Sequence, residues 1–169
     1  EETNRLDNTI LIITSDHSQK WTNSRLPLVI DIPGDTEAKK ISVNTENIDI
    51  APTLLDYLDI PQPAWMPGQS LLSGANNAHP IFTAKIPRSS RDSVTGKVVY
   101  PESKAPFFQF GRISVVECDQ WFELDLTEKT LKSGVVVDHS GACPLEADSR
   151  SAISLIIQHL QQYGFDASS

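Results

Sequence analysis

A short aliphatic run that ends in two polar residues is the clearest feature in the pattern of apolar and polar positions. Residues 10–13 are aliphatic at every position, and Asp16 and His17 follow shortly after. A run that is apolar on both faces, and too short to span a membrane, predicts a strand buried on both sides in a parallel sheet. Ligand sites in such sheets lie at the carboxyl ends of the strands, where Asp16 and His17 fall.

A second apolar run predicts another buried strand over residues 26–32. Pro27 stands at its start, where no hydrogen bond of the sheet is lost, and Pro33 with Gly34 predicts the turn that ends it. The polar loop between the two runs, residues 18–25, is short for a helical crossover. Either the two strands are not parallel neighbours, or a longer excursion has been trimmed.

Apolar residues then recur at helical spacing from Ile48 to Leu58, which predicts an amphipathic helix that packs on the core. Asn44 or Thr45 is expected to cap its start, and Pro52 is tolerated only if it lies near the first turn. Residues 61–72 are rich in proline and should run irregularly over the surface. The next residues, 73–77, are the best candidate for a boundary between subdomains.

Beyond this boundary the pattern changes to closely spaced short strands, which favours an antiparallel sheet. The strand-like runs are residues 81–84, 98–100, 107–110, 112–116, 121–126 and 135–137. Residues 152–164 predict a helix with one apolar stripe, a cap at Asp148 or Ser149, and Gly164 at its end. We expect this helix to cover one face of the sheet.

Together these elements predict an α/β chain in two parts. Residues 1–75 are expected to belong to a larger α/β domain, and residues 76–169 to form a small antiparallel-sheet subdomain with a terminal helix. The length of 169 residues can bury a sizeable core. A net charge of −8 and the lack of a run rich in lysine and arginine argue against a nucleic-acid partner. No apolar run reaches the length of a membrane helix.

Several side chains are candidates for chemistry. A carboxylate beside an imidazole, as in Asp16 and His17, can bind a divalent cation, although a solvated turn after a strand has the same pattern. Cys118 and Cys143 are too far apart in sequence for a CxxC motif, and are either one disulfide or two buried thiols. The remaining histidines are interpreted as structural or solvated; they are His79, His139 and His159.

Four fragments, in their order and spacing, resemble the carboxyl-terminal part of a sulfatase of the alkaline phosphatase superfamily. They are residues 8–17, residues 25–34, residues 49–60 and residues 68–72. The resemblance implies that the first fragments continue an alkaline-phosphatase-like sheet. It also implies metal-dependent hydrolysis of sulfate esters, or of related phosphate esters, with Asp16 and His17 as metal ligands. The cation implied is Ca, Mn, Mg or Zn, weakly bound or absent in the isolated chain.

The chain also departs from this family. Ser18 stands where a glycine is usual, and the shortened loop leaves Lys20 and Arg25 as candidate substrate-binding residues with structural or solvated alternatives. The family's nucleophile motif is absent, so no catalytic residue is assigned. We therefore expect the isolated chain to be inactive and its partner to be the missing amino-terminal half of the same protein.

Three other functions remain open from the sequence. The first is a phosphoglycerol- or phosphoethanolamine-type transferase, the second a catalytically dead sulfatase-like module that regulates or binds lipid, and the third an unrelated α/β interaction domain. For the sulfatase-like protein we expect a periplasmic or extracellular location, with a membrane tether, if there is one, outside this chain.

Overall fold

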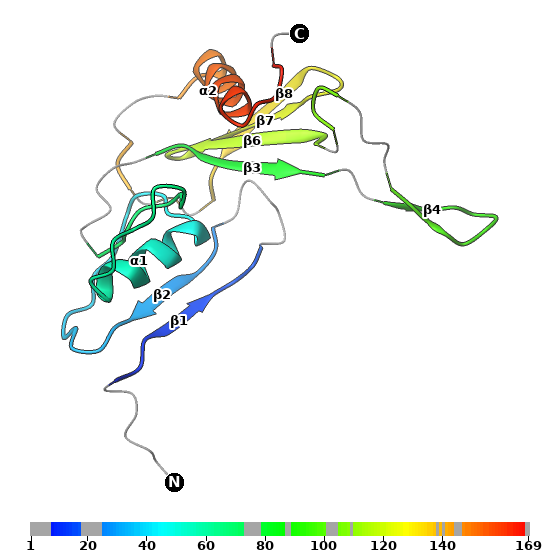
Figure 1. Cartoon of the computed structure of the whole chain (residues 1–169). Helices are drawn as coiled ribbons and strands as arrows, with labels where there is room; N and C mark the ends of the chain where they lie inside the picture. The colour runs from blue at the N-terminus through cyan, green and yellow to red at the C-terminus, as the bar shows by residue number, and fades with distance from the viewer. Residues whose placement is uncertain are drawn as a thin grey trace.

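Three antiparallel sheets and two α-helices make up the described part of the computed structural model (Figure 1). The structure describes residues 8–17, 25–72, 79–86, 89–100, 105–108, 110–137, 139, 141–143 and 147–167. The elements before residue 73 are β1 (Leu11–Thr14), β2 (Leu28–Asp31), the 3-10 helix η2 (Asn47–Asp49) and α1 (Ile50–Tyr57). Those after residue 78 are β3 (Ile81–Lys85), β4 (Ser90–Arg91), β5 (Val98–Val99), β6 (Arg112–Glu117), β7 (Gln120–Asp125), β8 (Thr130–Val135) and α2 (Ser149–Gln162).

The first two strands pair with each other in the antiparallel sense, with Leu11 opposite Asp31 and Thr14 opposite Leu28. The prediction of strands here is confirmed, but the prediction of strands buried in a parallel sheet is wrong. The short connecting loop brings the chain back beside itself, which was the first of the two alternatives. Among the described residues the sheet has only these two strands, so Ile13 and Val29 are 52% and 55% exposed.

A buried carboxylate, Asp49, organises the start of α1. Its side chain accepts a hydrogen bond from the backbone N–H of Glu46 at 2.8 Å and another from that of Gln69 at 2.9 Å. Glu46 therefore caps the helical segment that begins with η2, and the prediction of Asn44 or Thr45 as its cap is wrong. Pro52 is the third residue of α1, where the missing N–H costs no hydrogen bond.

The close approach of the 68–69 backbone to Asp49 requires a glycine. A Cβ atom on Gly68 would lie 2.5 Å from the carbonyl oxygen of Ile48, and Gly68 has a φ of +92°. Only glycine adopts this backbone conformation without strain and leaves room for the contact. The irregular segment 61–72, as predicted, contains no helix or strand, and this contact attaches it to the start of α1.

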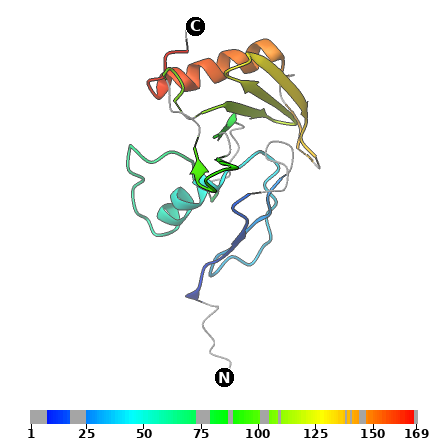
Figure 2. The same cartoon turned by 90° about the vertical axis from the view of Figure 1, so that its right-hand side faces the viewer.

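The larger sheet has the strand order β3-β6-β7-β8 and carries α2 on one face (Figure 2). Ala152, Ile156 and Leu160, four residues apart, form one stripe of α2 that packs on the sheet. The sheet residues buried against this stripe are Ile113, Val115 and Phe122. The antiparallel sheet, the helix on its face, the Asp148 cap and the positive φ at Gly164 are all confirmed.

Two strand predictions in this part are wrong. Residues 107 and 108 lie in a turn and an isolated bridge, and β8 covers Thr130–Val135 instead of residues 135–137. The sequence of β8 has no apolar pattern that would predict a strand, because β8 is an edge strand with mostly exposed side chains. On the neighbouring strand β7, Trp121 is paired with Gly134, and its indole ring fills the space that a side chain at position 134 would occupy.

The predicted subdomain boundary, residues 73–77, lies outside the described residues, so the division into residues 1–75 and 76–169 stays a prediction. Figure 1 shows the β1–β2 sheet and α1 on one side of the molecule, with the larger sheet and α2 on the other. The helices within the described ranges are too short or too polar to cross a bilayer.

Candidate functional site

The predicted metal-binding pair lies at the end of β1, as expected. The side chains of Asp16 and His17 are 86% and 61% exposed, and the His17 Nε2 atom lies 3.5 Å from the Asp16 Oδ2 atom. Asp16 Oδ1 also accepts the backbone N–H of His17 at 2.9 Å. This turn holds a carboxylate and an imidazole close together on the surface, where both can reach a common cation.

Asn47 connects the end of β1 to the start of η2. Its Nδ2 atom donates to the carbonyl oxygen of Ser15 at 3.0 Å, and its Oδ1 atom accepts a hydrogen bond from Thr14 Oγ1 at 3.2 Å. The residue just before Asp16 is therefore tied to the segment that begins the first helix. Sequence reasoning did not single out Asn47, because its partners lie more than thirty residues away.

A pocket of about 270 Å³ lies between the two parts of the molecule, and Asn47 is one of its lining residues. Arg25, the candidate substrate-binding cation, lies on the wall of this pocket, and its side chain is exposed. The other polar lining residues are Asn44, Thr45, Glu46 and Thr83, and the apolar ones are Leu26, Leu28, Ile81, Phe82, Val116 and Val136. Lys20, the other candidate, lies outside the described residues.

One carboxyl group on the pocket wall has unusual electrostatics. Burial raises the pKa of Glu46, and the hydrogen bond from His79 Nε2, 3.0 Å from Glu46 Oε1, opposes this effect. Gln69 Nε2 lies 2.9 Å from His79 Nδ1, so a neutral His79 donates to Glu46 and accepts from Gln69. The chain Gln69–His79–Glu46 joins residues from both sides of the predicted boundary. His79 is thus structural, as interpreted, but the sequence did not indicate its partner.

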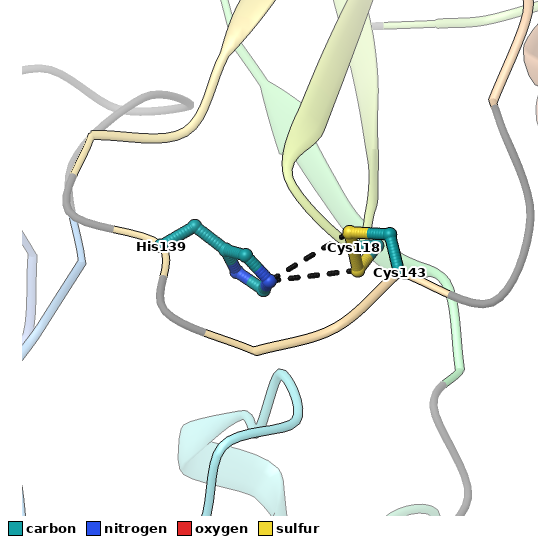
Figure 3. A group of neighbouring side chains, drawn as sticks. All are labelled: Cys118, His139 and Cys143. Carbon is teal, nitrogen blue, oxygen red and sulfur yellow. Dashed lines mark hydrogen bonds between the residues drawn. A yellow bond between two sulfur atoms is a disulfide. The ribbon is translucent and has the colours of Figure 1, made fainter.

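The two cysteines form a disulfide, which settles the alternative that the sequence left open. Cys118 and Cys143 have Cα atoms 5.6 Å apart, and the described residues include no free cysteine. His139 lies against this bond, with Nε2 3.5 Å from Cys118 Sγ and 3.7 Å from Cys143 Sγ (Figure 3). Disulfides persist in oxidising compartments, so this bond indicates such a location.

Metal-ligating side chains come together in one further place. Among the described residues, the cluster of Cys118, His139 and Cys143 is the only group of three or more such residues with ligand atoms near one another. Asp16 and His17 are not part of a group of three or more histidine, cysteine or acidic side chains within the described part of the chain. Both residues lie where the sequence predicted them, but their role as ligands stays a prediction.

Comparisons with known proteins agree on a family. Residues 18–86 match the family model described as N-sulphoglucosamine sulphohydrolase, C-terminal; Arg25 lies inside this match and Asp16 and His17 just outside it. The chain is also 33% identical over 86 residues to a protein of Drosophila melanogaster named extracellular sulfatase SULF-1 homolog. That similarity covers 43% of this chain and only 8% of the relative's length. Over residues 18–86 the chain is therefore similar to the carboxyl-terminal part of sulfatases.

Proposed function

We propose that this chain is the carboxyl-terminal part of a metal-dependent sulfatase that hydrolyses sulfate esters. The observation that carries the proposal is the joint position of a carboxylate–imidazole pair and a pocket. Asn47 bonds to the residue before Asp16 and also lines the pocket that Arg25 borders. A substrate in this pocket would have its charged end close to the metal ligands.

The donors of Asp16 and His17 fit a divalent cation in part. A carboxylate oxygen suits Ca, Mg or Mn, and an imidazole nitrogen suits Zn or Mn, but all of these ions need more ligands than two. The other ligands and the nucleophile are therefore supplied by the amino-terminal half of the same protein. The bound cation would supply Lewis-acid stabilisation of charge on the ester oxygens.

The residues of this chain have separate roles in the proposal. Asp16 and His17 hold the cation, while Arg25 and Lys20 bind the anionic oxygens of the substrate. The apolar side chains on the pocket wall exclude water from the substrate's other end. The family's description makes a sulfated amino sugar a substrate to test, and the pocket's mixture of amide, carboxyl and apolar groups suits a sugar ring.

The position of β1 and β2 supports a larger sheet. The apolar side chains of Leu11, Ile13 and Val29 are 44% to 55% exposed, which is unfavourable for a two-stranded sheet on its own. In the alkaline-phosphatase-like arrangement, strands of the missing half extend this sheet and other elements of that half cover these side chains. Residues 1–75 then belong to the large domain and residues 76–169 to the small one.

We place the protein on the extracellular or periplasmic side, because the disulfide needs an oxidising compartment and the Drosophila relative is named extracellular. A membrane tether, if the protein has one, lies outside this chain. A sulfate-ester hydrolase is favoured over a phosphate transferase because the matched family is a sulphohydrolase. Nucleic acid is not a proposed partner, since the chain carries a net charge of −8.

The test compares the longer protein that contains this chain with its Asp16→Ala, His17→Ala double variant. Loss of two ligands should remove the bound metal and lower kcat/KM for a nitrophenyl sulfate by at least about 100-fold. Metal content is measured by mass spectrometry, and N-sulphoglucosamine and a nitrophenyl phosphate serve as further substrates. Glu128→Ala, an exposed carboxylate on a distant turn, is the control.

Unchanged metal content and turnover in the double variant would contradict the assignment of Asp16 and His17 as metal ligands. Turnover of the phosphate but not of the sulfate would favour the transferase. Turnover of neither substrate, with the metal and the fold retained, would favour a regulatory module without catalysis.

A further inference from the structure

The Cys118–Cys143 disulfide has His139 against both of its sulfur atoms and has no role in the proposed function. Cys118 lies in the turn between β6 and β7, while His139 and Cys143 lie in the segment between β8 and α2. All three ligand atoms lie within 4.8 Å of one another (Figure 3). A thiolate binds metal and a disulfide sulfur does not, so the disulfide keeps this set of donors inactive.

We propose that the Cys118–Cys143 disulfide masks a zinc site, which two thiolates and the imidazole of His139 form when the bond is reduced. Two thiolates with one imidazole are a recognised ligand set for Zn²⁺ that keeps one coordination position open. In an oxidising compartment the disulfide is the stable form, so the site opens only when a dithiol reductant is present.

The position of His139 agrees with this ligand set. In a tetrahedral site, Zn–S bonds of about 2.3 Å and Zn–N bonds of about 2.0–2.1 Å place each sulfur about 3.6 Å from the nitrogen. The observed distances from His139 Nε2 are 3.5 Å to Cys118 Sγ and 3.7 Å to Cys143 Sγ. The imidazole thus needs little movement. The two sulfurs, once they are no longer bonded, must separate to about 3.8 Å.

The protons of His139 must rearrange. Nε2 lies 2.9 Å from the carbonyl oxygen of Gly141, so in the disulfide form it carries the proton and donates. Nδ1 is buried and has no hydrogen-bond partner among the described residues. Zinc binding requires the Nε2 lone pair and moves the proton to Nδ1, for which the described residues offer no acceptor. This cost makes the site weaker than a structural zinc site, and it leaves the Gly141 oxygen beside the cation as a fourth donor.

The reaction balances with a dithiol as the only co-reactant. The dithiol gives two electrons and two protons to the Cys118–Cys143 bond and becomes a disulfide, which leaves two thiols on the protein. Binding of Zn²⁺ then releases the two thiol protons to solvent, because both sulfurs ligate as thiolates. Affinity for Zn²⁺ should therefore fall as the pH is lowered.

Contacts outside the disulfide hold the ligands near one another after reduction. Asn44 Nδ2 donates to the carbonyl oxygen of Cys118 at 2.8 Å, which fixes the β6–β7 turn. Gly141 packs so closely on the backbone of Ser42 that a Cβ atom there would clash. Both ends of the cluster are thus attached to residues 42–44 independently of the S–S bond.

The experiment uses the whole 169-residue chain carrying Asp16→Ala and His17→Ala, so that no metal binds at the site of the proposed function. The chain is reduced with a phosphine, freed of oxygen and titrated with Co²⁺ and then with Zn²⁺. We expect one Co²⁺ per chain, with the absorption band of thiolate ligands, and displacement by Zn²⁺. The unreduced chain should show no such band.

His139→Gln should weaken Zn²⁺ binding by at least about 10-fold, because one of three protein ligands is lost. His159→Gln is the matched control and should leave the affinity unchanged. Circular dichroism follows the fold of the reduced chain. The proposal is wrong if the reduced chain shows no thiolate band, if it loses its sheet signal and binds no metal, or if His139→Gln binds Zn²⁺ as tightly as the parent chain.

Discussion

His159 shows how a single side chain couples packing to pH. Its imidazole stacks on the ring of Phe82, with ring centroids 3.8 Å apart, and also contacts Tyr163. Burial lowers the pKa of His159 from its ordinary value of 6.5. The sequence indicated a structural histidine here, and its aromatic partner comes from a strand more than seventy residues away.

This lowered pKa predicts a loss of stability in acid. Below pH 6.5 the unfolded chain binds a proton at His159 more readily than the folded chain does, so the free energy of unfolding falls as the pH falls through that window. His159→Phe keeps the aromatic stack but cannot titrate, and should show a smaller loss. Urea unfolding midpoints of both proteins between about pH 8 and 5 measure the difference.

Comparison of the two proteins removes the contributions of other groups. The raised pKa of Glu46 acts in the opposite direction, because the folded chain holds that proton more tightly, and it is present in both proteins. A difference between the two midpoints that stays constant with pH would contradict the assignment to His159.

At the scale of elements, Asp49 joins three segments that the sequence pattern treats separately. It is fully buried, stands directly before α1, and receives backbone hydrogen bonds from Glu46 and Gln69. Thr53 extends this connection, since its hydroxyl donates to the Asp49 carbonyl oxygen and accepts from the backbone N–H of Leu71. The proline-rich segment is thereby held by the helix it follows.

Asp49→Asn should therefore destabilise the chain. The asparagine amide replaces one acceptor with a donor, so a buried backbone N–H is left without a partner at a cost of about 1–3 kcal/mol. Urea unfolding of both proteins measures this loss. Asp59→Asn is the matched control, since Asp59 is exposed and its φ of 54° suits asparagine, and its effect should stay within about 0.5 kcal/mol. Equal effects of the two substitutions would mean that Asp49 does not hold these segments together.

At the scale of the whole molecule, the two parts meet at the pocket. Segments 25–28 and 44–47 line one side, and residues of β3 with Val116 and Val136 line the other. The Glu46–His79 contact and the Asn44–Cys118 hydrogen bond cross the same junction. The pocket is therefore a property of the assembled chain and belongs to neither part alone.

This arrangement predicts that the isolated 169-residue chain folds but does not hydrolyse sulfate esters. It offers two metal donors and no nucleophile motif, so its turnover of a nitrophenyl sulfate should equal that of buffer. Addition of the separately expressed amino-terminal half should restore hydrolysis and bury the exposed side chains of Ile13 and Val29, which hydrogen exchange of β1 and β2 can follow. Turnover by the isolated chain would contradict the proposal.

The sequence by itself determined those elements in which the spacing of apolar residues matches the buried face. The stripe of α2, its Asp148 cap and its terminal glycine were readable because helix packing repeats along the sequence. The positions of Asp16 and His17 were readable for a related reason, since they follow a strand. The family resemblance, rather than periodicity, suggested what they bind.

Only the tertiary structure decided which distant residues meet. Antiparallel pairing of β1 with β2, the polar edge strand β8 and the partners of Asp49 depend on neighbours that no local pattern contains. The same holds for the Cys118–Cys143 disulfide, because bond formation needs the two Cα atoms 5.6 Å apart, a distance that sequence separation does not specify. The sequence pattern predicts contacts between residues that are close in sequence, while contacts between distant residues depend on how the elements pack.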